Sequence, residues 1–73
     1  MSKLIRLDGS GHTTLAEWKP GDVRSQLRAL RAFREGLESG LLASATRNGQ
    51  AEVVRELPLD AELVVMRRPI AGG

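Results

Sequence analysis

Residues 22–37 read DVRSQLRALRAFREGL, and they form the only segment of this 73-residue chain with a clear helical pattern. Large apolar side chains recur there every three or four positions, which is the spacing of one helix face. They are Val23, Leu27, Leu30, Phe33 and Leu37, and we expect them to be the core side of the helix. Asp22 is the expected N-cap, because its carboxylate can accept a backbone N–H of the first turn. Gly36 and Gly40 are both candidates for the C-terminal end of the helix.

A second stripe on the same segment is basic. Arg24, Arg28 and Arg31 recur at helical spacing, about 100° around the helix from the apolar stripe. We interpret them as a solvated face that Glu35 partly neutralises through pairing along the helix. The stripe also leaves open an alternative function, a small basic module that binds phosphate or an acidic partner.

The segments on both sides of the helix read as strands. The expected strands are 3–7, 13–18, 41–46, 51–57 and 62–67. Turns are expected at Asp8–Gly11, at Asn48-Gly49 and at Pro58–Ala61, because glycine, asparagine and proline favour tight reversals. The order β-β-α-β-β-β predicts an α+β fold with one helix packed across a mixed sheet. Residues 62–67 are the most apolar strand, so we expect a central strand covered on both faces, which Pro69 ends.

Composition excludes several kinds of site. The chain has no cysteine and one histidine, His12, which leaves no disulfide, thiolate or usual zinc chemistry. Its formal net charge is +2 and its only aromatic residues are Trp18 and Phe33, so stacking on nucleic acid is not indicated. No apolar run is long enough for a membrane span, and the start of the chain is charged too early for a signal peptide. We therefore expect a cytoplasmic protein with no metal, nucleic-acid or membrane partner.

The last seven residues, 67–73, read RRPIAGG and follow directly on a predicted strand. Glycine has no Cβ atom, so Gly72 and Gly73 form a thread that can enter a narrow channel. A terminal carboxylate is ionised at neutral pH and can attack the α-phosphate of ATP. We therefore expect a domain at 1–69 and a flexible diglycine tail at 70–73.

Two parts of the chain resemble the ubiquitin-like β-grasp family, including its prokaryotic sulfur-carrier branch. Residues 4–15, which read LIRLDGSGHTTL, resemble the ubiquitin hairpin. Residues 47–73 resemble the small subunit of molybdopterin synthase and the thiamine sulfur carrier, with an Asn-Gly turn, an apolar strand and a closing Gly-Gly. Two features depart from the sulfur carriers: Asp60-Ala61 stands where they usually have Gly-Asp, and Arg67-Arg68 stands where they are often apolar.

The resemblance implies a carrier that is the substrate of other proteins and is not itself an enzyme. An activating enzyme, using ATP and magnesium, would adenylate Gly73; this chain would need no cofactor of its own. The lead prediction is a bacterial protein modifier conjugated to an acceptor protein, with a conjugating enzyme and an isopeptidase as further partners. The alternative is a sulfur carrier of the molybdopterin, thiamine or cysteine type, whose Gly73 becomes a thiocarboxylate for a synthase subunit. On its own the chain is expected to be a monomer.

Recognition by these partners is expected near the tail and on the sheet. Arg67 and Arg68 could pair with carboxylates of the activating enzyme, and Pro69, Ile70 and Ala71 connect them to the diglycine. The strand period of two places either Leu63 and Val65, or Val64 and Met66, on the sheet face away from the helix. The outward pair, with Leu4 beside it, would form a small apolar docking patch, and the candidate recognition residues there are Leu63 and Val65.

Overall fold

The computed structural model describes residues 1–69, and Ile70, Ala71, Gly72 and Gly73 lie outside the described residues. The helix and strands follow the predicted order β-β-α-β-β-β. Their bounds are β1 Ser2–Asp8, β2 Gly11–Trp18, α1 Val23–Glu38, β3 Leu42–Arg47, β4 Gln50–Val54 and β5 Leu63–Arg67.

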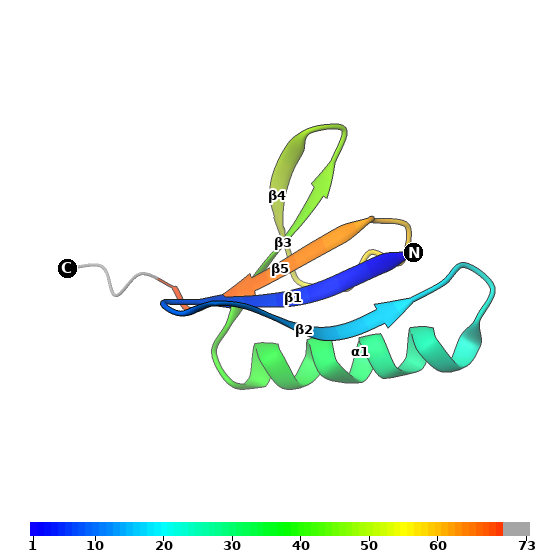
Figure 1. Ribbon diagram of the computed structural model, residues 1–73, viewed down its shortest axis with the longest axis horizontal. Helices are drawn as coiled ribbons and strands as arrows, with labels where there is room; N and C mark the ends of the chain where they lie inside the picture. Colours follow the sequence, from blue (N-terminus) through cyan, green and yellow to red (C-terminus); the bar gives the residue numbers. More distant parts are fainter. Residues whose placement is uncertain (70–73) are drawn as a thin grey trace.

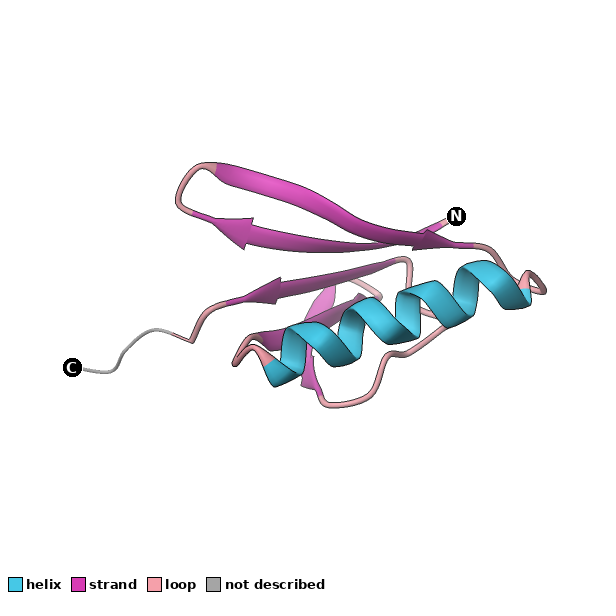
Figure 2. Ribbon diagram, turned by 90° about the horizontal axis from the view of Figure 1, so that it is seen from below, coloured by secondary structure: helices cyan, strands magenta, loops and turns pink. Residues whose placement is uncertain are grey.

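The five strands form one mixed sheet in the order β2-β1-β5-β3-β4. Strands β1 and β5 pair in parallel, with Lys3 opposite Leu63 and Arg6 opposite Met66, and the other neighbours are antiparallel. Helix α1 lies along one face of this sheet (Figures 1 and 2). The predicted α+β class, one helix on a mixed sheet, is confirmed, and the arrangement is compatible with a β-grasp-like fold.

Both hairpin turns lie where glycine predicted them. Gly9-Ser10 connects β1 to β2, and Asn48-Gly49 connects β3 to β4. Asn48 and Gly49 have φ angles of 50° and 78°, and consecutive positive φ angles are what a tight two-residue hairpin turn needs. The Asn48-Gly49 reversal therefore has the backbone geometry that its sequence predicts.

Helix α1 begins and ends with side-chain and backbone caps. The Asp22 carboxylate accepts the backbone N–H of Ser25 at 3.4 Å, which confirms the predicted N-cap. The helix ends at Glu38, and Gly40 follows with a φ of 92°. The backbone N–H groups of Gly40 and Leu41 donate to the carbonyl oxygens of Leu37 and Gly36, both at 3.0 Å, so Gly40 closes the helix in a Schellman motif.

The buried face of α1 differs from the predicted one. Ala29, Phe33 and Gly36 are buried against the sheet, whereas Val23, Leu27 and Leu30 are 64%, 59% and 39% exposed. The expected core stripe is therefore wrong for these three residues; Phe33 is in the core and Leu37 packs at its edge. Gly36 faces the buried Met66 side chain of β5, and a Cβ atom at this position would lie 2.6 Å from its Sδ and Cε atoms.

The core beneath the helix is built from one face of the sheet. Its largest fully buried side chains are Trp18, Leu4, Met66 and Val64. Strand β5 is central, as expected, but only this face of it is buried. Leu63 and Val65 on the other face are half-buried, so the prediction of a doubly covered strand is wrong. The fourth strand also ends earlier than predicted, at Val54 instead of residue 57.

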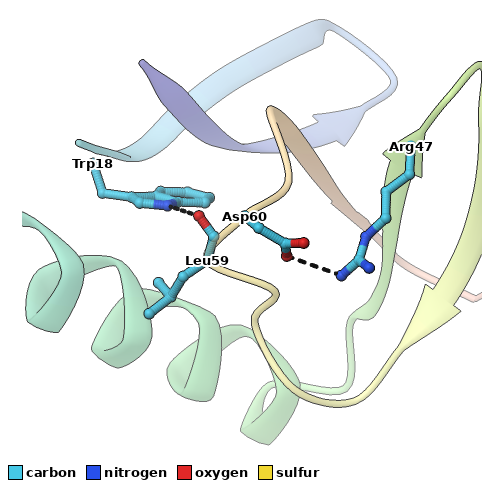
Figure 3. A network of polar contacts seen from close by, with 4 residues as sticks. All are labelled: Trp18, Arg47, Leu59 and Asp60. Atoms are coloured by element: carbon cyan, nitrogen blue, oxygen red, sulfur yellow. Dashed lines mark hydrogen bonds and ion pairs between the residues drawn. The ribbon is translucent and has the colours of Figure 1, made fainter. Parts of the chain in front are cut away.

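Polar contacts from several elements hold the connection between β4 and β5, including one from the Lys3 backbone N–H to the Glu62 carbonyl oxygen at 3.0 Å. The Trp18 indole N–H donates to the Leu59 carbonyl oxygen at 2.9 Å, and Arg47 pairs with Asp60 at 3.1 Å (Figure 3). The Ala61 backbone N–H donates to the Pro58 carbonyl oxygen at 3.0 Å, which confirms the predicted turn. Trp18 thus both fills the core and anchors the segment that leads into β5.

Candidate functional site

The chain leaves the sheet from its middle strand. Strand β5 ends at Arg67, between β1 and β3, and Arg68 and Pro69 follow with exposed side chains. Pro69 lies just beyond the strand, as expected of a residue that cannot donate to a ladder. The predicted tail residues Ile70 to Gly73 lie outside the described residues. Within residues 1–69, the candidate site is the surface around the point where the chain leaves the sheet.

Three arginines surround the exit, and we call Arg6, Arg67 and Arg68 the exit arginines. They line a hollow of about 410 Å³ together with Leu7, Asp8 and Gly9. Arg6 comes from β1 and reaches the exit because the parallel register sets it opposite Met66, one residue before Arg67. Sequence reasoning singled out Arg67 and Arg68 and missed Arg6, which only the pairing of the first and last strands could have revealed.

A second hollow, of about 400 Å³, adjoins the exit on the helix side of the sheet. Arg6 and Arg68 line it together with Glu35 and Ser39, from the C-terminal end of the helix. Arg6 is half-buried in its wall. Its lining has two cations and one carboxylate, so the net formal charge of the hollow is positive.

The exit arginines keep their charge available to a partner. Within residues 1–69, ion pairs join only Lys3 to Glu17 and Arg47 to Asp60. Asp8, which lines the same hollow, is held locally: the hydroxyl and the backbone N–H of Ser10 donate to its Oδ1 at 2.7 and 2.9 Å. These two hydrogen bonds from Ser10, with a smaller effect from the Arg6 charge, lower the pKa of Asp8. The geometry suits an acidic partner surface at the root of the tail.

The outer face of the sheet carries a shallow apolar patch. Val64 and Met66 point toward the helix and are fully buried, so the outward pair is Leu63 and Val65. Leu4 is buried on the helix side, and its expected place in the patch is wrong. Ile5, opposite Val65 in the register, takes that place on β1. Leu42 and Val53, 46% and 72% exposed, extend the apolar surface over β3 and β4.

The polar residues elsewhere suggest structural roles. Asp60 pairs with Arg47 at the turn, and His12 is exposed on β2. Over residues 1–69, no three His, Cys, Asp or Glu side chains gather in a way that could hold a metal ion. In the same range, the helix falls short of the length and apolar character needed to cross a membrane.

Comparison with known proteins identifies no similar protein. No protein-family model matches the chain, and no curated protein or solved structure matches it at a significant level. Any function therefore has to be argued from the exit, the outer patch and the helix surface.

Proposed function

We propose that this protein is a ubiquitin-like modifier of β-grasp type, whose Gly73 carboxylate is adenylated and then joined to an amine of an acceptor protein. The observation that supports it is the topology. A hairpin, a helix across the sheet and a last strand parallel to the first make up the β-grasp arrangement. Here β5 leads from that sheet, beside β1, toward Gly72 and Gly73.

The chemistry would use the terminal carboxylate of this chain and the catalytic groups of its partners. A Gly73 carboxylate oxygen attacks the α-phosphorus of ATP, and pyrophosphate leaves. A partner cysteine thiolate then displaces AMP to give a thioester, and an acceptor amine displaces the thiolate to give an amide. The chain itself contributes the reacting carboxylate, a tail narrow enough to be threaded and the exit arginines for docking.

Recognition would use two surfaces of the described residues. The exit arginines suit carboxylates on the enzyme that receives the tail. Leu63 and Val65, with Ile5 beside them, offer an apolar patch on the sheet face that the helix leaves open. Together they would orient the chain so that residues 70–73 point into the active site of the partner.

The test is a comparison of adducts in the cells that make the protein. An N-terminally tagged chain should appear in adducts that resist reducing agents, and a chain lacking Gly72 and Gly73 should appear in none. Trypsin cleaves poorly before proline, so cleavage after Arg67 should leave residues 68–73, RPIAGG, on the acceptor amine. A Glu52→Gln chain, changed at an exposed residue of β4, is the control and should form adducts normally.

Truncation should leave the folded domain intact, because Gly72 and Gly73 have no apolar side chain to bury. The thermal midpoint of the shortened chain should therefore match that of the full chain. Adducts that persist after truncation, or remnants that do not end in Gly73, would contradict the proposal.

A sulfur carrier is the second candidate, favoured by the turns after the helix. The Asn48-Gly49 hairpin and the Pro58–Ala61 turn that leads into β5 lie where the resemblance to sulfur carriers places them. In this case the acyl adenylate would react with a sulfide donor, and AMP would leave. Intact-mass measurement on the purified protein separates the candidates: a thiocarboxylate adds the mass difference between sulfur and oxygen, and no adducts form.

A further inference from the structure

The solvent side of helix α1 carries large apolar side chains that the fold does not use. Val23, Leu27 and Leu30 are spaced three and four residues apart, and they are 64%, 59% and 39% exposed. The helix packs on the sheet through Ala29, Phe33 and Gly36 instead. Burial of apolar side chains is favourable, and these three remain in contact with water. A partner surface that covered them would therefore gain binding free energy.

Leu30 also lies at the edge of a groove between α1 and the segment after β4. The groove holds about 380 Å³ and has an apolar floor of Leu30, Phe33, Leu37 and Leu57. Arg34 and Arg55 line it from the helix and from the facing segment, and Glu56 is its acidic member. The exposed apolar stripe is thus continuous with a concave site flanked by cations.

The first twelve residues of this helix carry only positive charge, and its acidic residues, Glu35 and Glu38, lie near its C-terminal end. Residues 23–34 contain four arginines, Arg24, Arg28, Arg31 and Arg34, all exposed, and no acidic residue. None of the four has a carboxylate within 4.0 Å among residues 1–69, so the expected pairing of Glu35 with Arg28 and Arg31 is wrong. Four cations around an apolar stripe are complementary to a surface that is itself acidic and apolar.

The shape of the surface favours a protein segment over a membrane or a nucleic acid. A bilayer surface would meet three apolar side chains and no exposed aromatic on this helix, which is little apolar area to insert. Single-stranded nucleic acid would find no aromatic side chain to stack on, because Phe33 is buried. A groove with an apolar floor and arginine rims fits apolar anchors flanked by carboxylates.

We propose that the exposed face of α1, together with the groove beside Leu57, binds an acidic amphipathic peptide segment of a partner protein. Leu or Ile side chains of that segment cover Val23, Leu27 and Leu30 and enter the groove. Its Asp and Glu side chains pair with Arg24, Arg28, Arg31 and Arg34. This surface is separate from the exit arginines, and its use requires neither adenylation nor the tail.

The test selects binders from a displayed library of random 16-residue peptides against the purified full chain, without any activating enzyme or ATP. The enriched peptides are then synthesised, and their affinities are measured by fluorescence anisotropy. They should carry an excess of Asp and Glu, with apolar residues three or four positions apart. Leu27→Gln and Arg28→Glu should each weaken binding at least tenfold.

Two control variants repeat the same kinds of substitution, apolar to Gln and Arg to Glu, at exposed positions outside the proposed surface. Val53→Gln removes an exposed apolar side chain from the sheet face that points away from α1. Arg67→Glu reverses one charge at the exit, as Arg28→Glu does on the helix. Each should change affinity by no more than about twofold, the size expected for a surface site away from the contact. Circular dichroism should show all four variants folded, because each replaces an exposed side chain.

Four outcomes would overturn the proposal. They are the enrichment of no peptide, enrichment of neutral or basic peptides, equal loss of binding in the control variants, and binding to phosphatidylserine vesicles that the two helix variants abolish. The last would assign the surface to an anionic membrane. Since the tail takes no part, failure here would leave the proposed function of Gly73 untouched.

Discussion

Gly36 shows how one missing side chain sets the spacing between helix and sheet. A Cβ atom at this position would lie 2.6 Å from both Sδ and Cε of Met66, closer than such atoms approach. Met66 is fully buried, and the end of its side chain would have to shift to admit a methyl group at this position. Gly36 therefore leaves room for the Met66 side chain beneath α1, while Gly40 ends the helix.

Gly36→Ala should expose this constraint in a double-mutant cycle. In the wild-type background, overpacking against Met66 should outweigh the better helix propensity of alanine and lower the free energy of unfolding by about 1 kcal/mol. In a Met66→Val background the same change should be neutral or stabilising, because the shorter side chain frees the space. Urea unfolding of the four proteins measures the coupling; additive effects would show that the contact is not tight.

At the scale of the element, helix α1 separates what local sequence can predict from what it cannot. The N-cap Asp22, the turn Asn48-Gly49 and the order of helix and strands along the chain were predictable, since each depends on neighbouring residues or on a simple alternation. The inward face was not, because the helix has two adjacent apolar arcs. The pattern of large side chains favoured Val23, Leu27 and Leu30, whereas the face packed on the sheet carries the small residues Ala29 and Gly36 beside Phe33.

Alanine substitutions on the two arcs test this orientation. Phe33→Ala should lower the free energy of unfolding by about 3–5 kcal/mol, because it leaves a cavity in the core. Leu27→Ala should change it by no more than about 0.5 kcal/mol, as expected at an exposed helix position. Comparable losses at both positions, measured by urea unfolding, would mean that the helix turns a different face to the sheet.

The candidate site was predictable only in part for a similar reason. Arg67, Arg68 and Pro69 could be found because they adjoin the diglycine in the sequence. Arg6 could not, because about sixty residues separate it from Arg67 and only the parallel register brings the two together. The outward direction of Leu63 and Val65 likewise needed a tertiary contact, the burial of Met66 under Gly36.

At the scale of the whole molecule, positive charge gathers at the end from which the chain leaves the sheet. The formal net charge is only +2, but Arg6, Arg67 and Arg68 lie together around that exit, and Asp8 is engaged by Ser10. The exit is thus one of two basic surfaces that an acidic partner can meet, and the exposed arginines of α1 are the other.

Replacing both Arg67 and Arg68 by Ala should weaken association with the activating enzyme by about 1–3 kcal/mol if each pairs with a carboxylate. The loss should shrink as salt is added, because exposed pairs are screened. Titration calorimetry at two ionic strengths measures both effects, and Lys19→Ala serves as a control at an exposed cation beside the helix. A loss that does not change with salt would point to packing of the arginine stems and against pairing.

The parallel alignment of β1 and β5 also determines how the molecule responds to force. The two strands begin at the same end of the sheet, with Lys3 opposite Leu63, so Ser2 and Arg67 lie at opposite ends of this pair (Figure 1). A pull applied between the start of the chain and the tail would load the hydrogen bonds between β1 and β5 together in shear. It could not open them one after another from an end, as peeling an antiparallel hairpin does. Resistance to pulling is governed by the rate of unfolding, so shear of this parallel pair should make the molecule unfold slowly under force applied between its two ends.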